Sequence, residues 1–432
     1  MTDTSQNIAF VRTETLPQQA PPASEVGVIG WMRHNLFNGL WGTALTLVSL
    51  YFVYYLLSGF LPWLFNGVWN TSNIRECREV LDGATGGCFS VLTERWNQLL
   101  FGFTYPEALY WRPTLAFVLL FVAAAPVLFV KYVPRQLLIV TGLYPFIAFY
   151  LIWGGTIYTP ILALVGIVVG YLVYSRLVTQ SFAMGFFGGV LAAALTWWIG
   201  GFVVDAIAPA EPALQAIASR DMGGFMLNMI LGTVCVSLSL PIGIVLALGR
   251  QSDMPIIKWI CVVFIEFIRG VPLITLLFVA NVVLAYFLPP GTNFDLILRV
   301  IIMITMFSAA YIAEVIRGGL AALPRGQYEA ADSLGLDYPQ AMRLIILPQA
   351  LKISIPGIVN VAVGLFKDTV LVSIISMFDL LGMIRGPILA STDWNGVYWE
   401  LFGFAALIFF VICFGISQYS QWLERQLATD HR

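Results

Sequence analysis

The chain has 432 residues, of which 59% are hydrophobic and 11% charged, against about 25% charged in ordinary globular domains, so a soluble globular fold is excluded. The formal net charge of -2 offers no excess of positive charge for a polyanionic partner such as nucleic acid. The two histidines, His34 and His431, lie near the chain ends, which argues against a metal cluster and against Ser/His/Asp catalysis.

Residues 1–36 mix Thr, Gln, Pro and Ser and hold no apolar run long enough for a signal-peptide core, so we expect a mobile cytoplasmic tail. After this tail, apolar stretches of the length that a membrane helix needs, about 20 residues, occur ten times. Two of them meet at Gly154 and Gly155, where a single broken helix is an alternative. The sequence therefore predicts an all-α integral membrane protein of about ten transmembrane helices, at 37–63, 114–131, 137–155, 158–176, 182–206, 225–250, 262–288, 296–320, 353–376 and 398–423.

Lysines and arginines in the short connections predict the orientation, because cytoplasmic loops are enriched in these residues. With alternating crossings, all of them fall on one side of the membrane. We take that side as the cytoplasm and place both termini there. The residues are Arg33, Lys131, Arg135, Arg176, Arg250, Lys258, Arg317, Arg325 and Arg343.

The loop at about 65–112 falls on the opposite, periplasmic side. It contains Cys77 and Cys88, whereas Cys235, Cys261 and Cys413 lie in predicted membrane spans. A disulfide is therefore predicted between Cys77 and Cys88, in the compartment that permits one. The alternative is two free thiols in an unstructured loop.

Two short motifs place opposite charges three residues apart within apolar spans, Glu266 with Arg269 and Glu314 with Arg317. Residues at this spacing share a helix face, and ionisable groups inside a bilayer usually face a bundle interior or a water-filled path. These four residues are candidates for the inner mouth of a translocation path. The alternative is self-neutralised pairs whose side chains reach the cytoplasmic interface.

Glycines and prolines interrupt two of the apolar stretches, at Gly270 and Pro272 and again at Pro356 and Gly357. Such breaks are tolerated where neighbouring helices satisfy the backbone. They are candidate hinges for alternating access, and packing kinks are the alternative.

The charged segment 324–348 is expected in the cytoplasm as a helix, a turn and a second helix. Pro324 can open the first helix, Gly335 suits the left-handed residue that ends it, and Asp337 can cap the second. Helices this short must dock on something, because isolated helices below about 12–15 residues are marginal in water. The small side chains of Ala330 and Ala331 would let another surface approach closely. The alternative is a connection that packs on its own bundle.

Lys367 and Asp368 lie about 20 Å along a helix that leaves the cytoplasm, beyond the midplane of a hydrocarbon core about 30 Å thick. An amino-acid zwitterion needs a cation for its carboxylate and an anion for its ammonium, so both residues are candidates for the translocation path. The alternative is a structural ion pair that holds a partner subunit.

The charged segment resembles the "EAA" signature of the membrane subunits of bacterial ABC importers, in which this loop inserts into a cleft of the ATPase subunit. The flanking segments beginning at Phe264, Ala309 and Pro348 are similar to the polar and general L-amino-acid uptake branch, and the similarity extends from about residue 225 to the C-terminus. The residues that match the signature, and that the resemblance assigns to ATPase coupling, are Glu329, Ala330, Ala331, Gly335, Ile345, Leu347 and Pro348.

The resemblance implies a permease core at 223–432, with a coupling loop at 324–348, preceded by an N-terminal membrane extension at 37–222. It also implies a multi-pass protein of the bacterial inner membrane that imports L-amino acids with an ABC ATPase dimer, a second permease subunit and a periplasmic amino-acid-binding protein. The sequence holds no GxxxxGK[ST] phosphate loop. We therefore expect a non-catalytic subunit that binds no cofactor itself, the ATP and Mg being used by the partner ATPase.

Two other classes of protein fit the apolar composition. An ion-gradient-driven secondary transporter would use intramembrane carboxylates for coupling. A membrane scaffold would transport nothing. Uptake by reconstituted protein distinguishes these two classes from an ABC permease. The permease requires ATP, the secondary transporter requires an ion gradient, and the scaffold gives no uptake.

Overall fold

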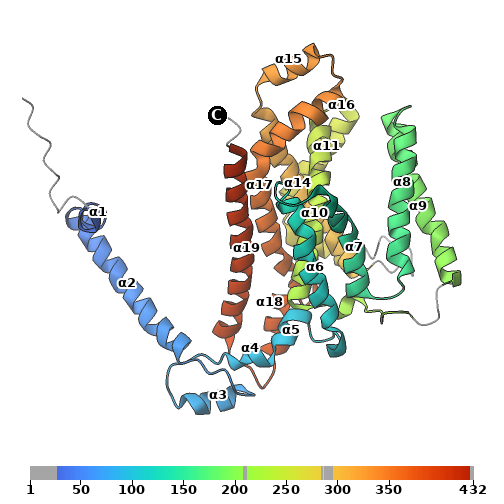
Figure 1. Cartoon of the computed structure of the whole chain (residues 1–432). Helices are drawn as coiled ribbons and strands as arrows, with labels where there is room; N and C mark the ends of the chain where they lie inside the picture. Colours follow the sequence, from blue (N-terminus) through green and yellow to red (C-terminus); the bar gives the residue numbers. More distant parts are fainter. Residues whose placement is uncertain (1–26, 208–211, 284–285, 287–294, 429–432) are drawn as a thin grey trace, which may run out of the picture. The chain divides into compact units, whose positions relative to one another are not determined.

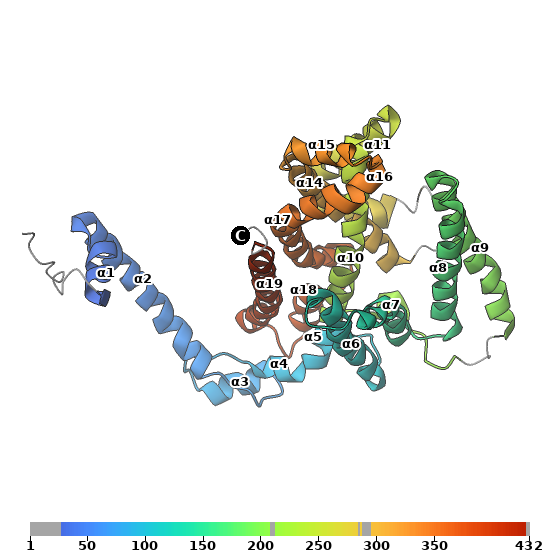
Figure 2. The same ribbon diagram turned by 45° about the horizontal axis from the view of Figure 1, so that its top comes forward.

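The computed structural model describes residues 27–207, 212–283, 286 and 295–428. These residues form helices, with two isolated β-bridges in place of any sheet (Figures 1 and 2). The α-helices are α1 (Gly27–Asn35), α2 (Gly39–Phe65), α3 (Ile74–Leu81), α4 (Ser90–Glu94), α5 (Trp96–Phe101), α6 (Trp111–Leu128), α7 (Leu138–Trp153), α8 (Tyr158–Leu177), α9 (Phe182–Ile207), α10 (Gly224–Gln251), α11 (Pro255–Gly270), α12 (Leu273–Phe278), α14 (Leu296–Ala321), α15 (Arg325–Ser333), α16 (Tyr338–Ala341), α17 (Leu347–Asp368), α18 (Leu380–Met383) and α19 (Tyr398–Ala428).

Short 3-10 and π segments extend several of these helices or join them. The 3-10 segments are η1 (Glu107–Leu109), η2 (Arg135–Leu137), η3 (Ser219–Asp221) and η6 (Thr369–Ile375), and the π segments are η4 (Val279–Val283), η5 (Met342–Ile346) and η7 (Ile384–Ile388). Within the described ranges, nine helical stretches are long and apolar enough to cross a membrane, or ten if one bent pair counts as a span. The all-α membrane fold predicted from the sequence is confirmed.

The bent pair corrects one predicted span. The stretch 262–288 is not one helix, because α11 and the segment Leu273–Val283 meet at an angle of 103°. Pro272 causes the break: it lies in an extended conformation with φ -60° and ψ 139°, and it has no N–H to continue the α11 ladder. The predicted interruption at Gly270 and Pro272 is therefore present.

The second predicted interruption is absent, since α17 continues through Pro356 and Gly357. Gly357 instead permits a close helix contact, because a Cβ there would lie 2.5 Å from Cγ1 of Val315 on α14. At Gly154 and Gly155, both with positive φ, the chain leaves α7, and α8 starts at Tyr158. These two glycines separate two helices rather than bend one.

The predicted mobile tail at 1–36 requires a second correction. Residues 1–26 lie outside the described residues, but 27–35 form α1 and are not an irregular tail. The chain divides into two compact units, of which the first is 1–68 with 79–87 and the second is 69–78 with 88–432. In the first unit, the segment 79–87 returns to the end of α2, where Gly87 N donates to Trp63 O at 2.8 Å.

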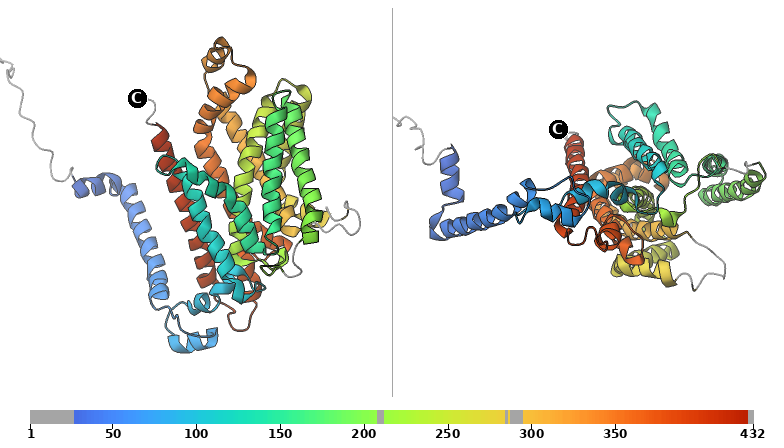
Figure 3. Two further views of the ribbon diagram at one scale, coloured as in Figure 1. Left: turned by 45° about the vertical axis from the view of Figure 1, so that its right-hand side comes forward. Right: turned by 90° about the horizontal axis from the view of Figure 1, so that it is seen from below.

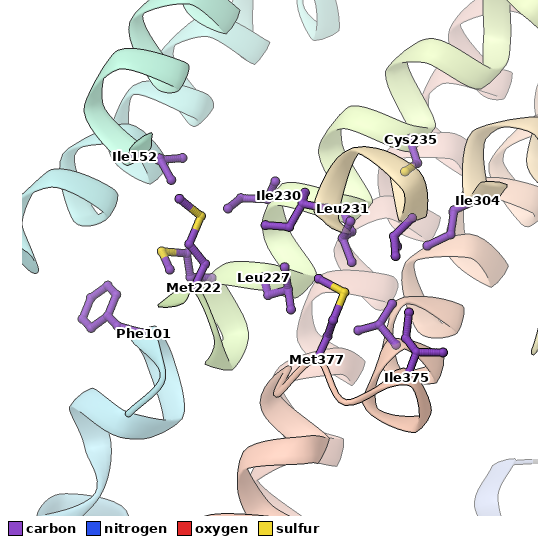
Figure 4. Close-up of a cluster of buried hydrophobic side chains, with 14 of the residues drawn as sticks. Phe101, Ile152, Met222, Leu227, Ile230, Leu231, Cys235, Ile304, Ile375 and Met377 are labelled. Carbon is purple, nitrogen blue, oxygen red and sulfur yellow. The ribbon is translucent and has the colours of Figure 1, made fainter. Parts of the chain in front are cut away.

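The second unit joins most of the N-terminal extension to the C-terminal core, so the unit boundary does not fall at residue 222. Helix α5 packs on the start of α10, where a Cβ on Gly102 would lie 2.9 Å from the Cα of Gly223. Figure 4 shows Phe101 from α5 and Ile152 from α7 in one apolar cluster with Leu227 of α10 and Ile304 of α14. Burial of these side chains accounts for the joint unit, because each buried methylene contributes about 0.8 kcal/mol.

A fully buried cation strengthens the same junction. Arg112 of α6 donates from Nε to the Leu151 carbonyl at 2.6 Å and from Nη1 to the Gln215 carbonyl at 2.9 Å. Leu151 lies in the last turn of α7, where carbonyls lack intrahelical partners and carry the negative end of the helix dipole. Arg112 thus links α6, α7 and the segment that leads into α10.

The loop at about 65–112 is ordered where it belongs to the second unit. A disulfide joins Cys77 of α3 to Cys88, with their Cα atoms 6.0 Å apart, and both side chains are buried. The backbone N–H of Cys88 donates to Glu400 Oε1 at 2.9 Å, and that of Ile74 donates to the Asp393 carbonyl at 2.8 Å. These contacts tie the loop to the start of α19, so the unstructured-loop alternative does not hold for this part of it.

Candidate functional site

The loop at 324–348 has the predicted helix, turn and helix, and it forms one end of the second unit (Figures 1 and 3). Pro324 precedes α15, and Gly335 adopts a left-handed φ of +68° after its last turn. The N–H of Leu336 then reaches back to the Ala331 carbonyl at 3.2 Å, as in the Schellman type of helix end. Asp337 accepts from the backbone N–H of Gln340 at 2.9 Å and starts α16.

Helix α15 has an inner face and an outer face. Gln327 accepts from Gln349 Nε2 at 3.0 Å, Tyr328 packs against a buried cluster of α14, η5 and α17 side chains, and Ala331 is fully buried. Ala331 therefore packs within this chain, and the expectation that it faces a partner is wrong. Glu329 and Ala330 are exposed on the outer face.

The outer surface of the loop is also apolar. Leu334, 73% exposed, and Tyr338, 59% exposed, follow the outer face of α15, and Leu344 is 64% exposed on η5. Of the other signature residues, Gly335 and Pro348 are exposed, while Ile345 and Leu347 are half-buried. These three side chains leave apolar surface exposed on the outer side of an ordered loop.

The intramembrane charges form one network on three helices. Arg250 at the end of α10 lies 2.8 Å from Glu266 Oε1 of α11 and 3.4 Å from Glu314 Oε2 of α14. Arg317 Nε donates to Glu314 Oε1 at 2.7 Å, so that predicted pair forms. The pairing of Glu266 with Arg269 does not occur among these contacts. Arg269 instead approaches Glu314 at 3.9 Å and stacks on the Tyr311 ring, 5.5 Å from its centroid.

Three arginines therefore face two glutamates, which leaves one positive charge. Within the described residues, Arg269 Nε is buried without a hydrogen-bond partner, and so is Glu314 Oε2. The 3.4 and 3.9 Å contacts to Glu314 Oε2 are electrostatic contacts without hydrogen-bond geometry. The sequence analysis used Arg250 only to assign the orientation, because its partners Glu266 and Glu314 lie on two other helices and only helix packing brings them to it.

A cavity of about 280 Å³ lies between α14 and α17, beside this network. That volume is close to the lower end of the range for small-molecule pockets, about 300–1,000 Å³. The Tyr311 ring that stacks against Arg269 forms part of its wall, and Asp368 is the one carboxylate in the wall. The lining residues are Phe307, Ser308, Tyr311, Val361, Gly364, Leu365 and Asp368.

The structure separates the neighbours Lys367 and Asp368. Asp368 is half-buried against the cavity, whereas Lys367 is exposed and does not line it. In the part of the chain that is described, no ion pair joins the two side chains. Adjacent residues on a helix point about 100° apart, which explains the divergence.

A buried polar network beside α18 was not predicted. Asn228 of α10 donates from Nδ2 to Thr369 Oγ1 at 2.9 Å and to Asp379 Oδ2 at 3.1 Å, and its Oδ1 accepts from the Leu380 N–H. All three polar side chains are buried. An Asn in an apolar span was the available signal, but its partners lie about 140 or more positions away.

Burial raises the pKa of Asp379 from 3.8 to about 6, against hydrogen bonds from Gly382 and Asn228 that lower it. The folded chain then holds this proton more tightly than the unfolded chain. The contribution of Asp379 to the free energy of unfolding is therefore largest below about pH 4. It declines as the pH rises to about 6, by about 3 kcal/mol in total.

We expect the melting temperature of the purified chain, relative to an Asp379→Asn variant, to fall between about pH 4.5 and pH 6.5. A difference between the two proteins that does not change with pH would contradict the assignment.

The membrane-length helices of the described residues, the anchored helical loop and the charge network beside a cavity are features of a membrane transport permease. Residues 239–428 match the family of binding-protein-dependent transport system inner membrane components. The glutamate/glutamine/aspartate/asparagine transport system permease protein BztC of Rhodobacter capsulatus is 52% identical over 446 residues, covering 100% of this chain and 100% of that protein. The inner membrane amino-acid ABC transporter permease protein YhdY of Escherichia coli is 37% identical over 404 residues, covering 92% of this chain and 93% of that protein.

A solved structure of an amino acid ABC transporter with histidines is 32% identical, covers 47% of this chain and 92% of that chain, and has a TM-score of 0.42. The full-length relatives establish the family. The chain belongs to the amino-acid ABC transporter permeases and is a multi-pass inner-membrane subunit of such an importer.

Proposed function

We propose that this chain is one of two different permease subunits in an importer of glutamate, glutamine, aspartate and asparagine. The observation that carries the substrate assignment is the 52% identity to BztC, which extends over the full length of both chains. The other proposed subunits are a dimer of ABC ATPases and a periplasmic amino-acid-binding protein. The permease itself performs no bond chemistry and binds no cofactor, and ATP and Mg are used by the ATPase.

The outer face of α15 is the proposed contact with the ATPase. Gln327, Tyr328 and Ala331 anchor the helix to the bundle, which leaves Glu329, Ala330 and the exposed Leu334 for the partner. A rigidly anchored helix can transmit a movement of the ATPase to α14 and α17, because both contribute to the cluster beneath it. Both chain termini are assigned to this same cytoplasmic side.

The cavity between α14 and α17 is the proposed passage for the amino acid. Asp368 supplies an anion for the substrate ammonium, and Arg269, whose Nε is free of hydrogen bonds within the described part of the chain, supplies a cation for a carboxylate. Charge-assisted hydrogen bonds of this kind are stronger than neutral ones, which suits recognition of a zwitterion. The net positive charge of the network favours the acidic substrates.

Reconstitution tests the proposal. The chain, its second permease, the ATPase and the binding protein are placed in vesicles, and uptake of labelled glutamate is measured with ATP inside, with a proton or sodium gradient alone, and with neither. We expect uptake that requires both ATP and the binding protein. A vesicle that omits only the binding protein is the matched control.

Uptake driven by a gradient without ATP would identify a secondary transporter and overturn the proposed coupling. ATP-driven uptake of a different amino acid, with none of glutamate, glutamine, aspartate or asparagine, would overturn the substrate assignment alone. Competition by each of these four unlabelled amino acids with the uptake of labelled glutamate then ranks the substrates by how strongly they compete.

A further inference from the structure

Helix α1 (Gly27–Asn35) has two chemically distinct faces. Val28, Trp31 and Met32 share one face, which ends in Asn35, by their spacing of three and four residues, and the three apolar side chains are exposed, Val28 at 74% and Trp31 at 59%. Arg33 and His34 lie on the opposite face, and the helix contains no acidic residue. An exposed apolar face with a basic opposite face is the pattern of helices that lie in a membrane surface.

The corner between α1 and α2 is held by hydrogen bonds. Leu36 N donates to the Met32 carbonyl at 2.8 Å, and the Thr46 hydroxyl of α2 donates to the Leu36 carbonyl. Gly39 has a positive φ of +79°, which lets the chain change direction where α2 begins. Figure 3 shows α1 bent sharply away from the axis of α2 in both of its views. The first helix therefore does not continue the membrane span.

The tryptophans of α2 show where the membrane surface lies. Trp41 and Trp63 are 22 positions apart on one helix, which corresponds to about 33 Å at 1.5 Å per residue. This distance matches a hydrocarbon core about 30 Å thick, and tryptophan is enriched at both of its boundaries. Trp41 thus marks one boundary, and α1 ends six residues before it, at Asn35.

We propose that α1 lies flat in the membrane surface at which α2 begins, with Val28, Trp31 and Met32 among the lipid acyl chains and Arg33 and His34 in the headgroup layer. The occupant of its apolar face is lipid. The position follows from the corner, because only residues 36–40 separate α1 from Trp41 and α1 turns away from the axis of α2. Under the proposed orientation the surface is that of the cytoplasmic leaflet, whose anionic headgroups complement Arg33.

Site-directed spin labelling tests this position. Cys235, Cys261 and Cys413 are replaced by Ala, and single cysteines at 28, 31, 32, 33 and 34 are labelled in the full-length chain, purified with the subunits that accompany it. The samples are reconstituted in vesicles of phosphatidylethanolamine and phosphatidylglycerol. Accessibility to oxygen, which partitions into lipid, is compared with accessibility to a water-soluble nickel chelate.

We expect positions 28, 31 and 32 to be accessible to oxygen, with nickel accessibility at least about fivefold below that of 33 and 34, as for a helix face buried about 5–10 Å into the boundary. Similar nickel accessibility at all five positions would place α1 in water and overturn the proposal. Exclusion of both reagents at 28, 31 and 32 would show that a protein surface covers this face and would also overturn it.

A second variant separates lipid insertion from helix formation. Trp31→Glu with the label at 28 is expected to raise nickel accessibility at that position, because a charged residue on the apolar face opposes insertion. Trp31→Leu keeps an apolar side chain that favours helix formation. It is expected to leave the nickel accessibility at position 28 unchanged. Equal accessibility in the two variants would contradict insertion through this face.

Discussion

Gly335→Val is expected to abolish amino-acid-stimulated ATP hydrolysis by the assembled transporter while leaving the membrane bundle folded. The φ of +68° at Gly335 is left-handed, and a residue with a Cβ pays about 1–2 kcal/mol to adopt it, more when β-branched. An ideal Cβ there meets no atom within 4 Å, so backbone conformation alone carries the effect. Loss of the turn would free the end of α15, and we expect at least about a tenfold drop in stimulated turnover.

Gly335→Asn is the matched control, because asparagine tolerates the left-handed region and also adds a side chain at the same place. It is expected to keep most of the stimulation. ATPase retention on an affinity-tagged permease and stimulated ATP turnover are measured for both variants. If Gly335→Val behaves like the wild type, the loop is a connection and does not couple the subunits.

Asp368→Asn is expected to lower uptake by tenfold or more without affecting assembly. Asp368 is the carboxylate in the wall of the cavity between α14 and α17, and a hydrogen bond to a charged group contributes about 1.5–3 kcal/mol. An amide keeps the shape of the side chain but cannot neutralise an ammonium group. The measurement is the initial rate of labelled glutamate uptake at matched levels of assembled transporter.

Lys367→Met is the control for Asp368→Asn, because it removes the adjacent charge from an exposed side chain that does not line the cavity. We expect it to transport at a rate near that of the wild type. A wild-type rate for Asp368→Asn would remove the cavity from the translocation path. A loss of assembly in both variants would instead assign both side chains a role in holding a partner subunit.

Local patterns gave reliable predictions where the relevant physics is local. The length of each apolar run, the proline at 272 and the glycine at 335 each act through their own backbone, so the broken span and the end of α15 could be anticipated. The capping of α16 by Asp337 likewise involves residues three positions apart. The helix at 27–35 was missed because its apolar run is too short to span a membrane and its polar face resembles a tail.

Predictions failed where a side chain finds its partner on another helix. Ala331 was expected to face a partner protein because it is small, yet its direction depends on how α15 docks through Gln327. Glu266 and Arg269 have the spacing of an ion pair, but Glu266 pairs instead with Arg250 of α10. Spacing on one helix does not report the charges that neighbouring helices bring.

Composition and local motifs were enough to identify the solvent, the helical class and the signature at 329–348, because an apolar composition and a twenty-residue pattern need no tertiary contact to be recognised. The packing of the helices was needed to show which charges meet, which face of α15 is free and that Asp368, rather than Lys367, borders a cavity. The physical reason is that a helix fixes the angle between its own side chains, whereas packing between helices decides which of them are buried together.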